Sequence, residues 1–391
     1  MKRILSLSII AFFFLLAVGG IGCQPSASKQ EIDRFLAEYA GQYGTDVKAV
    51  DSNGETLLHK AAAKWDIAVV KYLISKGADV SASDKNGNTP LYVAVSRENL
   101  EIAQFLVSKG ADPNSAIYIA VDSGNLGLVS MLLSKGVDVN ATGEDGSMLN
   151  IAIWNGNIEL VEFLVSKGAD VNAVGEDYGS ASMVDKKSSP LNVAVSRNKI
   201  GIVSFLISKG ANINEGSGSR RPLDVAIWNG DIELVEFLVS LGAEINYSAL
   251  FSATLQASNG KSQFFNFFLS KGVDINTRDR GRGTLLHTLI RSDHRGLEHV
   301  KLLVTNGADV NASGENDESP LHIAIRGLDR RDTRDIIKYL VSHGANVNAK
   351  DHFGRTPLAT LRSPRIGPSE PYLKRNIEEM EQYLISVGAH L

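Results

Sequence analysis

The residues that could do chemistry are few in this 391-residue chain, and their spacing supports no reaction. Cys23 is the sole cysteine, which excludes both an internal disulfide and a metal site built from several thiolates. Asp293, His294 and His299 lie close together in the sequence, but nothing fixes them in a ligand geometry. The chain contains no glycine-rich phosphate loop, nucleophile elbow or His-Glu-x-x-His pattern. We therefore expect no catalytic residue, no metal site and no cofactor, and a protein that is not an enzyme.

The position of Cys23 indicates covalent modification instead of catalysis. Two basic residues near the start are followed by the apolar run Ile9–Val18 and then by small residues, which is the order of a secretory signal. The junction Gly22-Cys23 resembles a bacterial lipoprotein signal, which implies cleavage before Cys23 and lipidation of its thiol and amine. Residues 1–22 would then be the signal peptide, and residues 23–30 the lipidated N-terminus and its tether. A soluble secreted protein and an uncleaved membrane anchor remain the alternatives.

The elements that position all other side chains are set by an internal repeat. The segment Ser75–Val80, Ser-Lys-Gly-Ala-Asp-Val, returns with small changes down nearly the whole chain. Several intervals are near 33 residues, and such a period is the signature of a solenoid of stacked copies. Its glycine recurs at Gly110, Gly136, Gly168, Gly210, Gly242, Gly272, Gly307, Gly344 and Gly388.

One copy, Asp84–Asn114, shows the expected structure of the unit. Asp84-Lys-Asn-Gly forms a turn, and Thr89 with Pro90 marks the start of a helix. Apolar residues at helical spacing then give one buried stripe on each of two short helices, and Gly110 ends the second. Because two short helices bury too little alone, each copy must stack on the next.

The unit resembles the ankyrin repeat, whose Thr-Pro-Leu-His tetrapeptide opens the first helix. The resemblance implies an all-α ankyrin-repeat solenoid of about ten helix-turn-helix repeats with short hairpin, or finger, loops. We expect the array over residues 50–391, with an atypical C-terminal repeat, and a capping helix over residues 31–49. The tetrapeptide stands, with drift, at Thr89–Tyr92, Ser189–Asn192, Ser319–His322 and Thr356–Ala359.

The period breaks at a few places. Gly110 to Gly136 is only 26 residues, so we expect that copy to lack its hairpin. The copy that ends at Gly272 is also short, and its first helix cannot be aligned. Val174–Ser188 lengthens one finger loop, and Arg326–Asp335 is inserted between two helices.

Three histidines, His59, His287 and His322, occupy the last position of the tetrapeptide. The family implies that they form hydrogen bonds between neighbouring repeats. Equivalent positions in a stack do not converge, so these histidines do not predict a metal site.

Two tryptophans are the most specific indication of a binding surface. Trp154 and Trp228 lie in near-identical copies of Ala-Ile-Trp-Asn-Gly. Trp154 follows Ala152 by two residues, about 200° around a helix, and therefore points off the buried stripe. In the ankyrin pattern this position faces the concave groove, where exposed aromatic residues are favoured anchors for a partner. The alternative is that each indole packs on its neighbouring loop and stabilises the stack.

Polar residues occupy the next position of the same helices. Arg97 and Arg197 align there with Lys64, Asn155 and Asn229, which predicts a polar groove with cationic points between aromatic ones. The alternative is that all five are solvated helix ends.

Together these features predict a non-catalytic scaffold that binds a protein or peptide partner and is tethered to the bacterial envelope. We expect a monomer, membrane-anchored on the periplasmic side. The net charge of −4 and the lack of a long basic stripe argue against nucleic acid as the partner. One alternative is an inhibitor or immunity-type protein that masks a co-encoded enzyme or toxin. Another is a secreted effector that binds host proteins.

The lipoprotein interpretation predicts the behaviour of a Cys23→Ser variant. Because the thiol would carry the lipid, the variant should move from the membrane fraction to the soluble fraction when cells are fractionated. A membrane fraction equal to that of the wild type would contradict lipidation at Cys23.

Overall fold

A computed structural model describes most of the chain, and Cys23 and the signal region lie outside the described residues. The described residues contain no helix long and apolar enough to cross a membrane. The chain divides into two compact units, one ending at Ala169 and the other beginning at Asp170. The description covers residues 29–44, 46–64, 66–143, 146–176, 187–216, 221–258, 260–279, 283–292, 296–330, 332–363 and 371–391.

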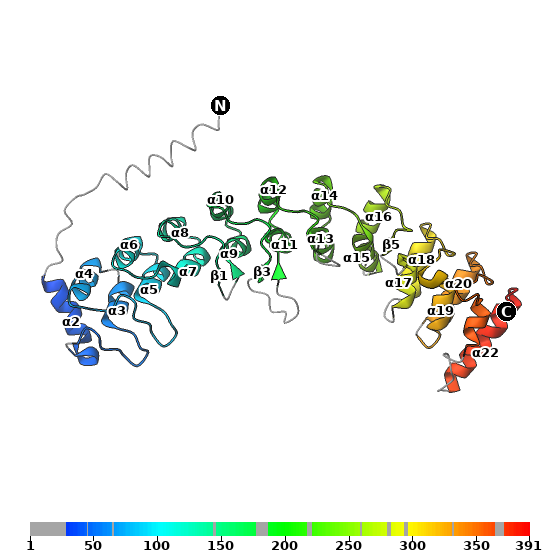
Figure 1. Ribbon diagram of the computed structural model, residues 1–391, viewed down its shortest axis with the longest axis horizontal. Coiled ribbons are helices and arrows are strands. Elements are labelled where there is room, and N and C mark those ends of the chain that lie inside the picture. Colours follow the sequence, from blue (N-terminus) through cyan, green and yellow to red (C-terminus); the bar gives the residue numbers. More distant parts are fainter. Residues whose placement is uncertain are drawn as a thin grey trace, which may run out of the picture. The chain divides into compact units, whose positions relative to one another are not determined.

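Unit 1 consists of helix pairs stacked side by side (Figure 1). The first helices of successive pairs, called inner helices below, pack on one another, and the second, or outer, helices form a second layer. The N-terminal helix α2 packs against the first outer helix. The inner helices are α3 (Leu57–Lys64), α5 (Pro90–Ser96), α7 (Ile117–Asp122) and α9 (Met148–Asn155). The others are α2 (Lys29–Tyr43), α4 (Ile67–Ser75), α6 (Leu100–Ser108), η1 (Pro113–Ser115), α8 (Leu126–Leu133) and α10 (Ile158–Ser166), with strands β1 (Thr142–Gly143) and β2 (Gly146–Ser147).

Unit 2 repeats this arrangement. Its inner helices are α11 (Pro190–Ser196), α13 (Pro222–Asn229), α15 (Tyr247–Ser258), α17 (Leu285–Arg291), α19 (Pro320–Arg326) and α21 (Pro357–Leu361). Its outer helices are α12 (Ile200–Ser208), α14 (Ile232–Ser240), α16 (Gln263–Ser270), α18 (Leu297–Thr305), α20 (Thr333–Ser342) and α22 (Pro371–Ser386). Short antiparallel hairpins join β3 (Gly175–Glu176) to β4 (Lys187–Ser188) and β5 (Arg278–Asp279) to β6 (Gly283–Thr284), and a 3-10 turn, η3, spans Glu315–Asp317.

The core follows the apolar spacing of the sequence. On α5, Leu91 and Ala94 are fully buried, and on α6 so are Ile102 and Leu106. The start of α5 is as expected, because the Thr89 hydroxyl accepts the Tyr92 backbone N–H and Pro90 is the first helical residue.

The tetrapeptide histidines link consecutive copies, as the family implies. In His322 the Nδ1 atom accepts the Ser319 backbone N–H, so Nε2 carries the proton and donates to the Arg355 carbonyl of the next copy at 3.0 Å. His287 bonds the Glu318 carbonyl in the same way at 3.0 Å, and His59 bonds Asn88 at 3.1 Å. Burial lowers the pKa of His287 and of His322, which keeps both rings neutral at neutral pH.

Asparagines at the end of the repeated segment form a second link between copies. Asn311 donates to the Gly344 carbonyl at 2.9 Å and accepts the Asn346 backbone N–H at 2.7 Å. The bond from the asparagine to the next glycine carbonyl recurs at Asn140, Asn172, Asn214, Asn276 and Asn348.

The link changes where the period breaks. Asn114 bonds Asp112 of its own turn, and Asn246 caps α15 by accepting the Ala249 backbone N–H. Each of these asparagines precedes a short copy. In the first of these copies the turn η1 leads directly into α7, where the sequence predicts no hairpin. In the second, α15 is the inner helix that could not be aligned from the sequence. The predicted long finger is present as the pair β3 and β4, and its centre lies outside the described residues.

The asparagine link predicts a local loss of stability on substitution. Asn311→Ala removes two hydrogen bonds between copies, so it should lower the free energy of unfolding by about 1 kcal/mol. Asn114→Ala removes a bond within one turn and serves as the matched control. Urea denaturation followed by circular dichroism would compare them, and equal losses in both variants would contradict a role for the link.

Candidate protein-interaction surface

Trp228 is one of the predicted binding residues that the structure exposes to solvent. It stands in the last turn of α13, whose residues Ala226 and Ile227 are fully buried, and its own exposed fraction is 45%. The helix ends at Gly230, which adopts a left-handed conformation with φ of 81°. A rigid, packed helix therefore presents an indole to solvent at its end.

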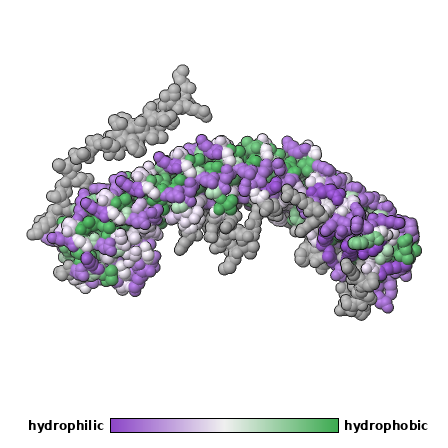
Figure 2. Space-filling model, viewed as in Figure 1, coloured by the Kyte–Doolittle hydropathy of each residue, from purple (hydrophilic) through white to green (hydrophobic). Residues whose placement is uncertain are grey.

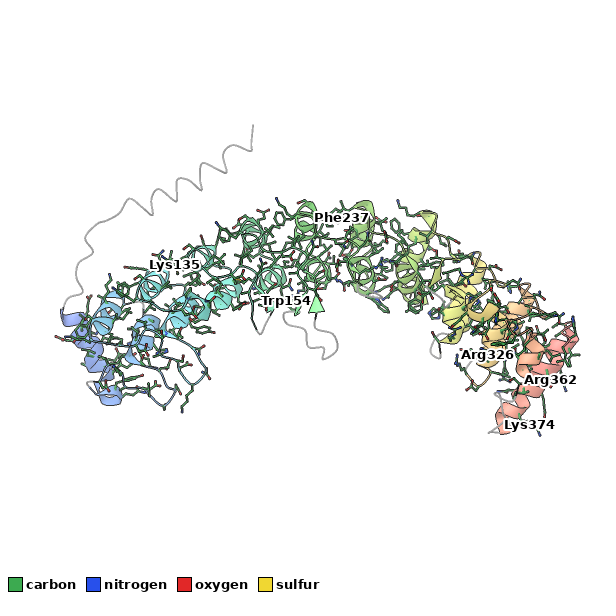
Figure 3. All side chains as sticks on the ribbon, viewed as in Figure 1. Lys135, Trp154, Phe237, Arg326, Arg362 and Lys374 are labelled. Carbon is green, nitrogen blue, oxygen red and sulfur yellow. The ribbon has the colours of Figure 1, made fainter. Side chains whose placement is uncertain are left out.

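Trp154 occupies the same position on α9 of unit 1. It is half-buried, whereas Ala152 and Ile153 are fully buried. Figure 3 shows it on the side of α9 that faces away from the outer helices. Trp154 belongs to unit 1 and Trp228 to unit 2, so each is described within its own unit.

The neighbouring asparagines use part of their side chains within the stack. Asn155 donates to the carbonyl and carboxylate oxygens of Asp122 on α7, at 3.0 and 3.1 Å. Asn229 donates to the carbonyls of Val195 and Ser196 on α11, at 3.2 and 3.3 Å. Both asparagines therefore hold the end of the preceding inner helix next to the tryptophan.

The three predicted cations differ in their surroundings. Lys64 forms an ion pair with Glu38 of α2 and lies over the Tyr39 ring at 5.0 Å, so it ties the capping helix to the first copy. Arg97 and Arg197 follow α5 and α11 directly and are exposed. The structure places these arginines at the inner-helix ends, and their part in binding stays a prediction.

Sequence reasoning missed two further residues in the tryptophan position. Trp228 stands five residues after Leu223, the buried leucine of its tetrapeptide. Arg291 on α17 and Arg326 on α19 each stand five residues after the equivalent buried leucine. Arg326, labelled in Figure 3, forms an ion pair with Glu318. Aligning the copies on that leucine would have found both arginines.

The histidine position carries other polar residues in the middle of the chain. Asp224 on α13 is fully buried, and its carboxylate accepts the hydroxyls of Ser248 and Ser252 on α15, at 3.2 and 3.1 Å. Burial raises the pKa of Asp224 to about 6, although the two hydroxyl bonds and Arg221 lower it. Asn150, at this position on α9, is fully buried, and its side chain has no hydrogen-bond partner among the described residues.

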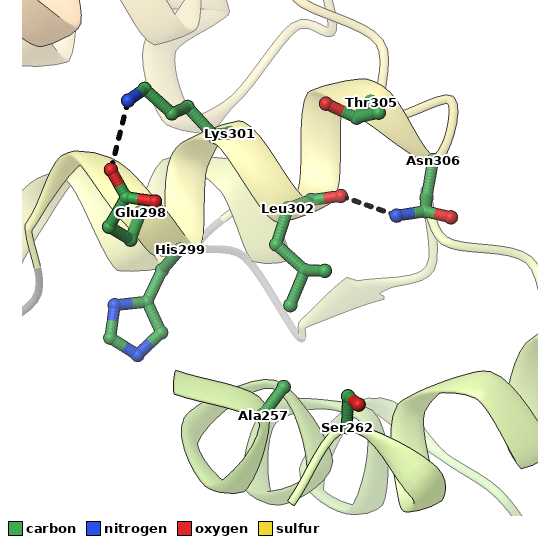
Figure 4. A pocket seen from close by; sticks show the side chains of 8 residues that line it. All are labelled: Ala257, Ser262, Glu298, His299, Lys301, Leu302, Thr305 and Asn306. Carbon is green, nitrogen blue, oxygen red and sulfur yellow. Dashed lines mark hydrogen bonds and ion pairs between the residues drawn. The ribbon is translucent and has the colours of Figure 1, made fainter. Parts of the chain in front are cut away.

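A cavity of about 540 Å³ lies between the α15–α16 pair and α18 (Figure 4). In unit 2, the outer helix α14 packs on α16 and α18 packs on α20, but at the cavity α18 packs on the inner helix α15. His299, which lines the cavity, stands where α6 has the fully buried Ile102. Asp293 and His294, its neighbours in sequence, lie outside the described residues. Within the described part of the chain, no group of three histidine, cysteine or acidic side chains could hold a metal ion.

Comparison with known proteins identifies the class. Four segments, residues 27–117, 113–175, 176–249 and 253–359, match a family model described as ankyrin repeats (3 copies). The chain therefore belongs to the ankyrin-repeat family, and the expected solenoid fold is confirmed. Ankyrin repeats form protein–protein interaction scaffolds and are typically non-catalytic.

The curated relatives share short stretches with this chain. Alpha-latroinsectotoxin-Lt1a of Latrodectus tredecimguttatus is 52% identical over 52 residues, which are 13% of this chain and 4% of the toxin. Alpha-latrocrustotoxin-Lt1a of the same organism is 38% identical over 66 residues, 15% of this chain and 4% of that toxin. The matches thus cover only 4% of either relative. Among solved structures, the human ASB11 ankyrin repeat domain is 24% identical with a TM-score of 0.42, over 50% of this chain and 90% of that chain.

The buried Asp224 predicts a stability that falls as pH rises. Its pKa is about 6 in the folded state against 3.8 for an aspartate free in water, so the folded state binds the proton more tightly. The contribution of protonated Asp224 to the stability of the folded state is fully present below pH 4 and is lost as pH rises through 6. At pH 7.5 the free energy of unfolding of Asp224→Asn should therefore be about 1–3 kcal/mol higher than that of the wild type.

The same comparison at pH 4 should show little difference between Asp224→Asn and the wild type. Glu233→Gln, which removes an exposed carboxylate on the neighbouring α14, is the matched control. Urea denaturation at both pH values measures the effect. A gain that is equal at both values would show that ionisation of Asp224 is not its cause.

Proposed function

We propose that this protein is a non-catalytic scaffold, tethered to the bacterial envelope, that binds a protein or peptide partner through its inner-helix ends and finger loops. The observation that carries the binding proposal is Trp228, whose indole is 45% exposed at the end of an otherwise buried helix. Exposed tryptophan is costly to leave in water and is enriched at interface hot spots.

The surroundings of Trp228 support the proposal, because they hold it in place. α13 packs between α11 and α15, and Asn229 bonds the end of α11. A partner that covers this indole therefore orders few side chains, and less conformational entropy opposes binding. Trp154 has the same neighbours in sequence and an equivalent asparagine bond in unit 1.

The envelope tether rests on the sequence alone. The apolar run Ile9–Val18 and the Gly22-Cys23 junction resemble a lipoprotein signal. The serine and proline in the following residues are typical of a tether between a lipid anchor and a folded array. Lipidation at Cys23 would hold the scaffold at a membrane while the array stays outside it.

Replacement of both tryptophans tests the binding proposal. Trp154→Ala with Trp228→Ala should reduce crosslinking of the partner in cells about tenfold, because two large apolar contacts are lost. Crosslinking followed by mass spectrometry of the captured partner measures this, and the two single variants show which unit is engaged.

The control is Leu241→Ala, which removes an exposed apolar side chain that follows outer helix α14. The melting temperature of the double variant should stay close to that of the wild type. A large decrease would assign the tryptophans to stability of the stack, and unchanged crosslinking would remove them from the binding surface.

A further inference from the structure

Exposed arginines lie over buried carboxylates at the C-terminal part of unit 2. The Arg326 side chain is 42% exposed, whereas the side chain of its ion-pair partner Glu318 is only 4% exposed. The Arg355 side chain is 31% exposed, and its partner Asp351 is fully buried. In both pairs the cation faces solvent and the anion is hidden beneath it.

Hydrogen bonds of the stack bring these groups into one neighbourhood. Glu318 precedes α19, and its carbonyl is held by His287 on α17 at 3.0 Å. The Arg355 carbonyl is held by His322 on α19, also at 3.0 Å. The Glu318 carboxyl therefore lies between the copies that carry Arg291, Arg326 and Arg355, and all three guanidinium groups act on it electrostatically.

Arg355 is fixed in orientation by its partner, whereas Arg291 is linked to its surroundings mainly through its backbone. Arg355 donates through Nε and Nη2 to Asp351 Oδ2, at 2.8 and 2.7 Å. Arg291 lies 4.0 Å from Glu315, and its carbonyl accepts Arg330 at 2.6 Å, which joins it to the segment after α19. Fixed guanidinium groups lose little side-chain entropy when a further anion binds them.

An exposed aromatic side chain adjoins the arginines. Phe353 lies in the turn of the last finger and is 67% exposed, more than Trp228. The Arg355 guanidinium lies 4.7 Å from the centre of its ring. The turn is rigid, because Asp351 Oδ1 accepts the backbone N–H groups of Phe353 and Arg355, each at 2.9 Å. In Figure 2 the part of unit 2 around these helices is mainly hydrophilic on the face shown.

We propose that Arg291, Arg326, Arg355 and Phe353 form a docking surface for an acidic protein segment that also carries an apolar side chain. Below, this set is called the arginine surface. It rests on the proposed function, since it names the chemistry of a partner for the scaffold. Carboxylates of the segment would pair with the outward guanidinium nitrogens, and the apolar side chain would cover Phe353.

Charge complementarity selects this occupant. The whole chain has a net charge of −4, yet here two of the nearby acids are hidden from solvent and the arginines are not. Among the described residues, Glu315, 55% exposed, competes for Arg291, and Asp317, 65% exposed, lies 3.8 Å from His352, the neighbour of Phe353. Planar guanidinium groups match carboxylates in a bidentate geometry, and the aromatic ring favours a protein segment with a side chain to bury.

Selection of peptides from a random displayed library on the full chain tests the proposal. The peptides recovered should be enriched in Asp and Glu next to an aliphatic or aromatic residue. Their affinity is measured by fluorescence anisotropy. It should fall markedly as NaCl is raised from about 50 to about 500 mM, because salt screens the attraction between the peptide carboxylates and the arginines. Arg291→Glu and Phe353→Ser should each weaken binding about tenfold.

Phe353 is at the surface, and Arg291→Glu leaves the direct Arg326–Glu318 ion pair in place, so folding should be retained, and circular dichroism checks this. Lys209→Glu, after α12, is the control with the same change of charge. Glu315→Gln removes the competing carboxylate and should strengthen binding about twofold. Arg326 is better left intact, because its loss would leave Glu318 buried without its partner.

Several results would overturn the arginine surface. One is a library that yields no binder, or peptides without acidic enrichment. Another is binding that Arg291→Glu leaves unchanged. Tighter binding of single-stranded DNA or of phosphatidylserine vesicles, lost in Arg291→Glu, would show that the partner class is wrong. Acidic peptides that need Trp154 and Trp228 but not Arg291 would contradict the arginine surface and leave the scaffold function standing.

Discussion

The hydrogen bonds that run from one copy to the backbone of the next are the constraint on which the structure depends. A pair of short helices cannot bury enough apolar surface to fold alone, so its neighbours must complete its core. The histidine and asparagine bonds fix how far and at what angle the next copy sits. His322 to Arg355 does this at the start of an inner helix, and Asn311 to Gly344 does it beyond the end of an outer helix. The exposed side chains of each copy are therefore positioned by how the copies stack.

The same constraint explains where the array tolerates change. A neutral histidine can satisfy two groups at once, because one nitrogen accepts and the other donates. Asp224 keeps a bond between copies by a different route, since two serines of α15 reach back to it. Asn150 is buried at the same position without a hydrogen bond among the described residues, which costs stability. The bonds between copies are therefore not uniform along the stack.

Much of this fold could be predicted from sequence, because the repeat averages out local ambiguity. Ten variations on one motif identify the helix starts, the buried stripe and the histidine bonds, and Thr89 and His59 behave as their positions predict. The first helix of the copy that ends at Gly272 could not be predicted, since α15 lacks the tetrapeptide and its asparagine link is replaced by a cap. The cavity beside α18 was equally out of reach. It depends on a tertiary contact between α15 and α18 that no local pattern encodes.

Some of the candidate binding residues could be predicted from the sequence, and others depend on tertiary packing. Tryptophan is conspicuous in a sequence, so its outward position could be inferred from helical spacing alone. Exposed arginine is ordinary, and nothing in the residues near Arg326 distinguishes it from a solvated helix end. What distinguishes it is the burial of Glu318, which depends on the packing of the finger between two copies. Burying that carboxylate is tolerable only because guanidinium groups lie over it. The arrangement that stabilises the stack therefore also leaves cationic groups facing outward, so stability and recognition share the same side chains there.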